Sequence, residues 1–123
     1  MEKICLDLDI LIEFLRGDPL TIEKIKHYSD KEEICITPQT LLYIMLSVRK
    51  QGAIMPFLNS ISVLSFDRKA ATLAVKIIEE NREKGRTMGM DEIMTAAICM
   101  SSGSFLCTKN RKNFEQIKNL KIL

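Results

Sequence analysis

The sequence contains no tryptophan and only one histidine, and its net charge at pH 7 is just +2. The chain therefore lacks the interleaved aromatic residues on which single-stranded bases stack. Its overall charge does not by itself indicate a nucleic-acid partner. There is no run of about 18 apolar residues, so we expect no membrane-spanning helix. Acidic residues at positions 7, 9 and 13 interrupt the apolar N-terminal stretch, which argues against a signal peptide.

A zinc site built from cysteine and histidine is also unsupported. The four cysteines form no Cys-x-x-Cys pair, and no histidine stands at a spacing that suits zinc. Each cysteine lies within an apolar segment, so we expect small core residues in the reducing environment of the cytoplasm. These residues are Cys5, Cys35, Cys99 and Cys107.

The composition is that of an ordinary globular protein, with 46% apolar and 28% charged residues among 123. We expect one domain over residues 1–123, in which short apolar strands alternate with helices. Such alternation predicts a three-layer α/β/α fold with a mainly parallel sheet of four to five strands. Strands are expected at 4–6, 33–36, 61–66, 104–108 and 120–123, and helices at 9–16, 21–28, 38–52, 68–84, 91–102 and 111–117.

The helix expected at 38–52 has recognisable start and stop signals. Thr37 is a suitable N-cap, and Pro38 suits the first helical position. Two basic residues precede Gly52, as is typical of a helix C-terminus. We expect only a short connecting segment at 53–59 before the third strand.

Polar residues gather where the predicted strands end. Asp7 and Asp9 directly follow the first strand, and residues 108–110 follow the fourth. Asp91 lies in the first turn of a helix, where the helix dipole tolerates an anion. Ligands of open parallel sheets collect at these strand ends, so Asp7 and Asp91 are expected to share a crevice. Two carboxylates there would need protonation or a cation such as Mg²⁺, although each aspartate could also be a helix cap.

Four segments carry a resemblance to a known family, the PIN-domain ribonucleases, and above all to the VapC-type toxins of toxin–antitoxin pairs. The segments follow one another in the family's order and cover nearly the whole chain. They read LDLDILIEFLRGD (6–18), ITPQTLLYIML (36–46), VLSFDRKAATLAVKII (63–78) and MDEIMTAAICMSSGSFLCTKNRKNF (90–114).

The resemblance implies an endoribonuclease dependent on Mg²⁺ or Mn²⁺, in which metal-activated water hydrolyses an RNA phosphodiester. The family's metal-binding aspartates match Asp7 and Asp91, and its fourth acid falls on Asn110. Asp9 and Thr108 would support the site. The resemblance also implies RNA as substrate, a cognate antitoxin peptide and a homodimer as partners, and no membrane association.

Departures from the family pattern reduce the acidic charge of the expected site. Leu8 replaces the family's Ser or Thr, and Tyr43 stands where the family has a glutamate. A neutral phenol is a poor magnesium ligand, so we expect one weak metal site and not two. Glu13 and Glu92 are possible substitutes, although one helical step turns Glu92 about 100° from Asp91.

Basic residues near the fourth strand offer contacts for the substrate. We expect Lys109 and Arg111 to bind RNA. A wider group at 84, 86, 109, 111 and 112 either flanks the crevice and attracts phosphates or forms a solvated face.

Two other functions are compatible with the sequence. The first is a PIN-fold protein that has lost cleavage and keeps RNA or protein binding. The second is a phosphohydrolase with an aspartate nucleophile, because DLDIL (7–11) resembles the opening of haloacid-dehalogenase-type enzymes. Leu11 departs from that motif, and the chain is short for that fold.

Overall fold

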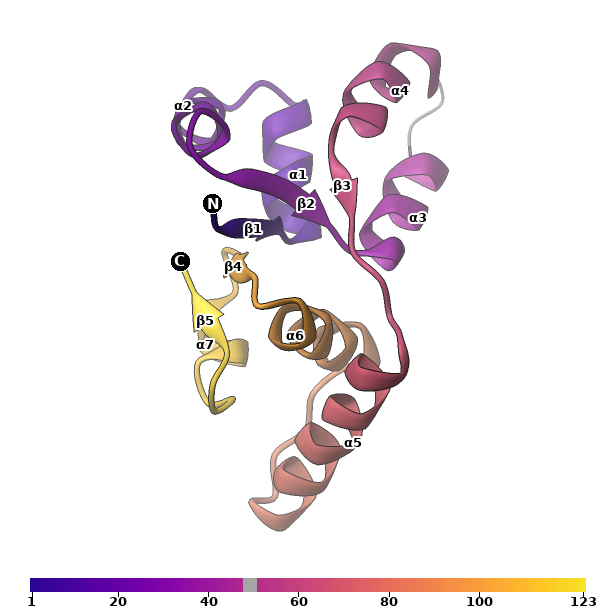
Figure 1. Cartoon of the computed structure of the whole chain (residues 1–123), viewed down its shortest axis with the longest axis vertical. Helices are drawn as coiled ribbons and strands as arrows, with labels where there is room; N and C mark the ends of the chain where they lie inside the picture. Colours follow the sequence, from indigo (N-terminus) through magenta and orange to yellow (C-terminus); the bar gives the residue numbers. More distant parts are fainter. Residues whose placement is uncertain (48–50) are drawn as a thin grey trace.

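The computed structural model describes residues 1–47 and 51–123. Within these residues a fully parallel sheet of five strands has the order β3-β2-β1-β4-β5 (Figure 1). The predicted α/β architecture is therefore confirmed. The strands are β1 (Lys3–Leu6), β2 (Glu33–Ile36), β3 (Ser62–Val63), β4 (Phe105–Cys107) and β5 (Lys121–Ile122).

Helices cover both faces of this sheet (Figure 1). The helices α1 to α4 pack on one face, and α5, α6 and α7 pack on the other. Their bounds are α1 (Leu8–Leu15), α2 (Pro19–Ser29), α3 (Pro38–Ser47), α4 (Gln51–Ser60), α5 (Arg68–Glu83), α6 (Met90–Ser102) and α7 (Arg111–Phe114). None of the helices in the described ranges is both long and apolar enough to cross a membrane.

The alternation of side chains along each strand creates two separate cores. In β1, Ile4 and Leu6 join the cluster under α1 to α4, whereas Cys5 joins the cluster under α5 and α6. Strands β2 and β4 divide their residues between the two clusters in the same way. Successive side chains of a strand point to opposite faces, so a sheet buried on both sides must be apolar at every position. This requirement explains the uninterrupted apolar runs in the sequence.

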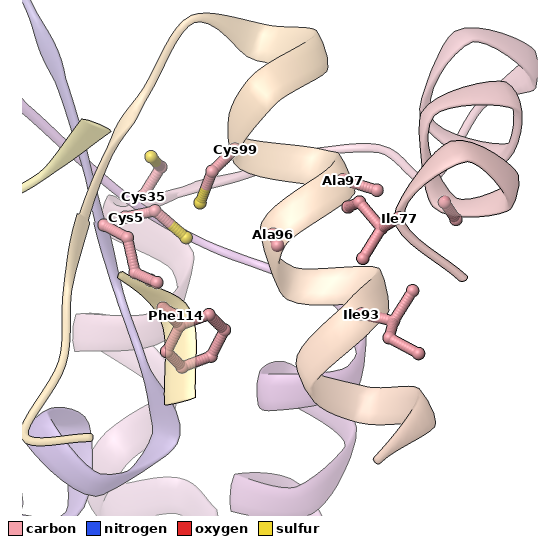
Figure 2. Close-up of a cluster of buried hydrophobic side chains, with 10 residues drawn as sticks. Cys5, Cys35, Ile77, Ile93, Ala96, Ala97, Cys99 and Phe114 are labelled. Carbon is pink, nitrogen blue, oxygen red and sulfur yellow. The ribbon is translucent and has the colours of Figure 1, made fainter. Parts of the chain in front are cut away.

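The core on the α5 and α6 side is built from small residues around one aromatic ring (Figure 2). Ala96 and Ala97 of α6 are fully buried, and Ala97 lies beside Ile77 on the side of α6 that faces α5 (Figure 2). Figure 2 shows Cys5, Cys35 and Cys99 gathered near Phe114. All four cysteines of the chain are free and buried, as expected of core residues.

The region between β2 and β3 differs from the prediction. Thr37 does cap α3, because its Oγ1 accepts a hydrogen bond of 3.2 Å from the Thr40 backbone N–H. However, α3 ends at Ser47, and Gly52 lies in a further helix, α4, where we expected a stop and then a short connection. The basic residues 49 and 50 of the expected helix end lie outside the described residues.

The helix α4 forms because packing outweighs its local breakers. Pro56 lies inside this helix and should weaken it. Nevertheless, Leu58 is buried in the core beneath α1 to α4, and Ile54 and Phe57 pack against that core. The strand expected at 61–66 is also shorter than predicted. Only Ser62 and Val63 pair as β3, at the exposed edge of the sheet.

The order of the strands fixes where a functional site can form. From β1 the chain adds β2 and β3 on one side, and it then returns to place β4 and β5 on the other. The direction of strand addition therefore reverses between β1 and β4. Crevices open at such switch points, beyond the carboxyl ends of the strands.

Candidate active site

A small cleft of about 130 Å³ opens beyond the ends of β1 and β4. Asp7 and Asp91, which the sequence places 84 positions apart, both line this cleft. Its other polar lining residues are Gln39, Thr40, Tyr43, Glu92, Thr95 and Asn110. Four segments therefore contribute to one crevice: the end of β1, the first turns of α3, the start of α6, and the segment that follows β4.

The carboxylate of Asp7 is held on both oxygens. Its Oδ1 accepts a 2.9 Å hydrogen bond from the Leu8 backbone N–H at the start of α1. Its Oδ2 accepts a 2.8 Å hydrogen bond from the Thr108 hydroxyl, which follows β4. Burial raises the pKa of Asp7, the Thr108 hydrogen bond opposes the shift, and the charge of Asp9 adds to it. Asp7 is thus a fixed, incompletely neutralised carboxylate, and it is also the cap that we considered as the alternative.

Asp91 enters the cleft from the first turn of α6 and is exposed. Its Oδ2 accepts a 2.7 Å hydrogen bond from the Tyr43 hydroxyl of α3. This bond raises the pKa of Tyr43, because Asp91 stabilises the protonated phenol. Tyr43 therefore lies where a glutamate at the same position would point at Asp91. As a phenol it donates to that carboxylate and adds no negative charge.

Glu92, named from the sequence as a possible substitute for the missing glutamate, also lines the cleft despite the helical step that separates it from Asp91. Its Oε1 accepts a 3.1 Å hydrogen bond from the Gly89 backbone N–H. Its Oε2 accepts a 2.8 Å bond from Asn113 Nδ2. A glutamate three residues after the N-cap residue folds back in this way, and its carboxylate accepts a hydrogen bond from the N-cap backbone N–H. The motif Gly-x-x-Glu, at 89–92, was the available signal. The charge of Glu92 contributes to the raised pKa of Asp7.

Asp9 and Glu13 serve a different purpose, because both bind the loop that follows β4. Asp9 accepts hydrogen bonds from the backbone N–H groups of Ile10, at 2.7 Å, and Lys109, at 3.1 Å. Glu13 forms a 2.6 Å ion pair with the Lys109 ammonium and accepts a bond from Thr21. Glu13 is thus bound to Lys109 and Thr21 and does not face the cleft, and an orienting role of Asp9 in the site stays a prediction.

Of the site residues predicted after β4, some line the cleft and others do not. Asn110 lines the cleft, and its backbone N–H donates to Thr108 Oγ1 at 3.0 Å. Lys109 and Arg111 are not among the lining residues. The guanidinium of Arg111 instead donates to the carbonyl of Leu123. Substrate binding by Lys109 and Arg111 stays a prediction.

The donor set of the cleft suits one hard cation and not two. No group of three or more His, Cys, Asp or Glu side chains within 1–47 and 51–123 is arranged to hold a metal ion. The cleft does offer Asp7 and Asp91, neither of which forms an ion pair with a described residue. It also offers Gln39, whose Oε1 is buried without a hydrogen-bond partner among the described residues, while its Nε2 donates to Thr95. Carboxylate and amide oxygens are ligands that Mg²⁺ accepts, with water completing the shell.

Comparison with known proteins finds relatives that match the chain over nearly its full length. No family model matches the chain. The chain is 27% identical over 128 residues to the tRNA(fMet)-specific endonuclease VapC of Shigella flexneri, covering 98% of this chain and 96% of that protein. It is 25% identical over 124 residues to ribonuclease VapC2 of Haemophilus influenzae, covering 95% and 93%.

Solved structures with the same fold include two toxin–antitoxin complexes. VapBC2 of Rickettsia felis, bound to a DNA fragment from its promoter, has a TM-score of 0.88 at 19% identity, covering 98% of this chain and 97% of that chain. DNA-bound VapBC of Salmonella typhimurium has a TM-score of 0.85 at 26% identity, covering 100% and 98%. The predicted resemblance to VapC-type PIN-domain proteins is therefore confirmed in both sequence and fold, over nearly the whole chain.

Proposed function

We propose that this chain is an endoribonuclease of the VapC toxin type that uses one divalent ion, Mg²⁺ or Mn²⁺. The observation that carries the proposal is the meeting of Asp7 and Asp91 in the cleft at the switch point of the sheet. The two carboxylates balance the charge of one divalent cation. The names of the sequence relatives, which are endonucleases and ribonucleases over the same length, support the reaction class.

Different residues of the cleft would hold the metal ion and orient its ligands. Asp7 and Asp91 would hold the ion, and Gln39 and Asn110 would offer neutral oxygens beside it. When bound, the ion would polarise the phosphoryl oxygens and lower the pKa of water. Thr108 and the start of α1 fix the orientation of Asp7 before substrate arrives. Such preorganisation avoids the cost of rearranging the carboxylate during the reaction.

The proposed partners follow from the structural neighbours. These neighbours are complexes of VapB with VapC, which supports a small antitoxin as the partner that neutralises this chain. We also propose a homodimer, and a cytoplasmic location in which RNA is available and free cysteines persist.

One observation favours a second candidate, a PIN-fold protein that binds without cutting. The Tyr43 hydroxyl occupies an oxygen of Asp91, and a metal ion would have to compete with it or share the carboxylate. The third hypothesis, an aspartate-nucleophile phosphohydrolase, is not proposed. The fold matches VapC-type structures along almost all of the chain.

The proposal is tested by RNA cleavage with purified, antitoxin-free protein. We expect a labelled structured RNA to be cut with Mn²⁺ or Mg²⁺ and to stay intact in EDTA. Asp7→Ala and Asp91→Ala should each lower the cleavage rate by about a hundredfold or more, because each removes half of the charge that holds the ion. Asp30→Ala is the matched control, since Asp30 is exposed and does not line the cleft. Cutting in EDTA, or full activity of Asp7→Ala, would contradict the proposal.

A measurement of Mn²⁺ binding tests the metal site separately from catalysis. Calorimetric titration of Mn²⁺ should give about one site per chain in the wild-type protein and in Asp30→Ala, but no measurable site in Asp91→Ala. Equal Mn²⁺ binding by the wild type and Asp91→Ala would show that Asp91 is not a ligand.

A further inference from the structure

Beside the cleft lies a second recess, of about 210 Å³, on the other side of Glu92. It is formed by the end of α5, the loop before α6, and α7 with the segment that follows it. Asn81, Arg86, Lys112 and Gln116 are among its lining residues. Because Glu92 lines both hollows, a ligand that extends from the cleft would reach this recess next.

Two hydrogen-bond donors in the recess have no acceptor. Asn81 is only 6% exposed, and its Nδ2 is buried without a partner among the described residues. Arg86 Nε is likewise buried and unpartnered there. A buried N–H group without an acceptor is costly, so such groups are rare in folded proteins. Two of them in one recess indicate that an acceptor from outside the chain belongs there.

Three acceptor oxygens of the recess already receive hydrogen bonds from other groups. Both carboxylate oxygens of Glu92 receive hydrogen bonds, one from the Gly89 backbone N–H and one from Asn113. The side-chain oxygen of Gln116 receives a hydrogen bond from Arg86 Nη1, which also fixes the guanidinium. None of these oxygens lies within hydrogen-bonding reach of Asn81 Nδ2 or Arg86 Nε, because both donors are without a partner among the described residues.

The charge of the recess also favours an anion. Arg86 and Lys112 contribute two positive charges, and Glu92 contributes one negative charge, which leaves an excess of one positive charge. A phosphate group carries only acceptors at its non-bridging oxygens, and it pairs well with a planar guanidinium. A nucleobase is uncharged, so it would leave the excess positive charge of the recess without a partner.

We propose that this recess binds a phosphate of the RNA strand next to the one that is cut. Arg86 Nε and Asn81 Nδ2 would donate to its oxygens, and Lys112 would add charge. This inference rests on the proposed function, since it assigns the recess to the same substrate. It gives the chain a contact for the strand that does not depend on the metal ion.

Binding of a labelled RNA hairpin, followed by fluorescence anisotropy in EDTA, tests the proposal without cleavage. Arg86→Gln should weaken binding by about tenfold and lower the slope of log K against log salt by about one phosphate contact, roughly 0.7 to 0.9. Lys84→Gln is the control. It removes the same charge from an exposed residue two positions away, outside the lining of the recess, and should change affinity less than about twofold. Thermal unfolding would confirm that both variants are folded.

A second variant distinguishes a phosphate site from a recess that merely holds water. Asn81→Asp places a carboxylate beside Arg86, where it can satisfy Arg86 Nε and repel a phosphate. We expect a higher melting temperature and an RNA affinity at least as low as that of Arg86→Gln. A higher melting temperature with RNA affinity unchanged would identify a structural recess and overturn the proposal.

The remaining outcomes also decide the question. If Arg86→Gln and Lys84→Gln behave alike while Mn²⁺-dependent cutting persists, this inference fails and the proposed function stands. The same holds if cutting persists but no RNA binding is seen in EDTA. If RNA is neither bound nor cut, both fail. The last outcome concerns free inorganic phosphate, compared with chloride at equal ionic strength. If phosphate raises the melting temperature of the wild type but not of Arg86→Gln, and RNA affinity is the same for both, the ligand is a small anion. The assignment of the recess to RNA would then be wrong.

Discussion

The acidic side chains around the ends of β1 and β4 fall into two groups with opposite surroundings. Asp9 and Glu13 are bound by the loop after β4, through the backbone N–H and the ammonium of Lys109. Asp7 and Asp91 receive hydrogen bonds from hydroxyl groups, at Thr108 and Tyr43, and from the Leu8 backbone, but no ion pair within the described ranges. The first group links α1 to the β4 loop, whereas the second retains negative charge that an external cation can neutralise.

The comparison teaches that sequence spacing does not decide the role of a carboxylate. Asp7 and Asp9 are two positions apart, yet the fold directs one into the cleft and the other toward a backbone amide. Their difference is set by contacts with residues about 100 positions away in the chain. A substitution in either group should therefore act first on the hydrogen bonds and ion pairs of that group, although the charge of Asp9 also contributes to the raised pKa of Asp7.

The largest expected effect comes from adding charge to the cleft. Tyr43→Glu would place a carboxylate beside Asp91 in place of the donating phenol. We expect the affinity for Mn²⁺, measured by calorimetry, to rise by about tenfold or more, because a third carboxylate joins the ligand set. Tyr43→Phe is the control, since it removes the hydrogen bond without adding charge.

The outcome of this substitution also chooses between the two candidate functions. If the wild type leaves RNA intact at every metal concentration while Tyr43→Glu cuts it, the chain is a PIN-fold protein that has lost cleavage. If neither the affinity nor the cutting responds to Tyr43→Glu, Tyr43 does not stand at the metal position.

A medium effect is expected from Asp7→Asn on stability without metal. Burial raises the pKa of Asp7 above its ordinary value of 3.8, so the folded state keeps this proton to higher pH than the unfolded state. The contribution of Asp7 to stability is therefore lost as the pH rises from 3.8 through the folded value. Melting temperatures should be measured in EDTA from pH 3 to pH 7, at intervals of about 1 pH unit. We expect the melting temperature of Asp7→Asn to rise relative to that of the wild type as the pH increases over this range. A difference that stays constant with pH would contradict this sign.

The smallest effect on stability is expected from a change in the first group, which consists of Asp9 and Glu13. The ion pair between Lys109 and Glu13 is largely exposed, and such pairs contribute little to stability. Lys109→Gln should lower the melting temperature only slightly, and the difference should shrink further at high salt. The Mn²⁺ affinity should stay at the wild-type value. A large loss of Mn²⁺ affinity would show that the two acidic groups are coupled, and the comparison would fail.

The parts of the fold that local signals determine were predictable from the sequence. Asp67 directly precedes the helix expected at 68–84, as suits an N-cap, and its Oδ1 accepts a 2.9 Å hydrogen bond from the Ala70 backbone N–H. Gly103 directly follows the helix expected at 91–102, and it adopts a left-handed conformation with φ of 70° at that end. The strand ends that carry Asp7 and residue 108 were predictable for the same reason, since short apolar runs mark buried strands.

The remaining features depend on contacts that the sequence does not display. The helix α4 contains Gly52 and Pro56, which are local breakers, and it is stabilised by burial of Leu58 against distant elements. The partner of Lys109 lies 96 positions away, so its ammonium could not be assigned to Glu13 in advance. Helical geometry alone turned Glu92 away from Asp91, because it does not show that the Glu92 side chain folds back over the start of α6.

The hydrogen bond between Thr108 and Asp7 joins two residues that are 101 positions apart, one near the start of the chain and one near its end. During synthesis on the ribosome, the strand that precedes Thr108 is made about 100 residues after Asp7, and until it emerges β1 lacks one of its two neighbours in the sheet. A nascent chain without β4 therefore cannot complete the cleft. If the folded protein cuts RNA, this order of assembly keeps it inactive while the first hundred residues are being made.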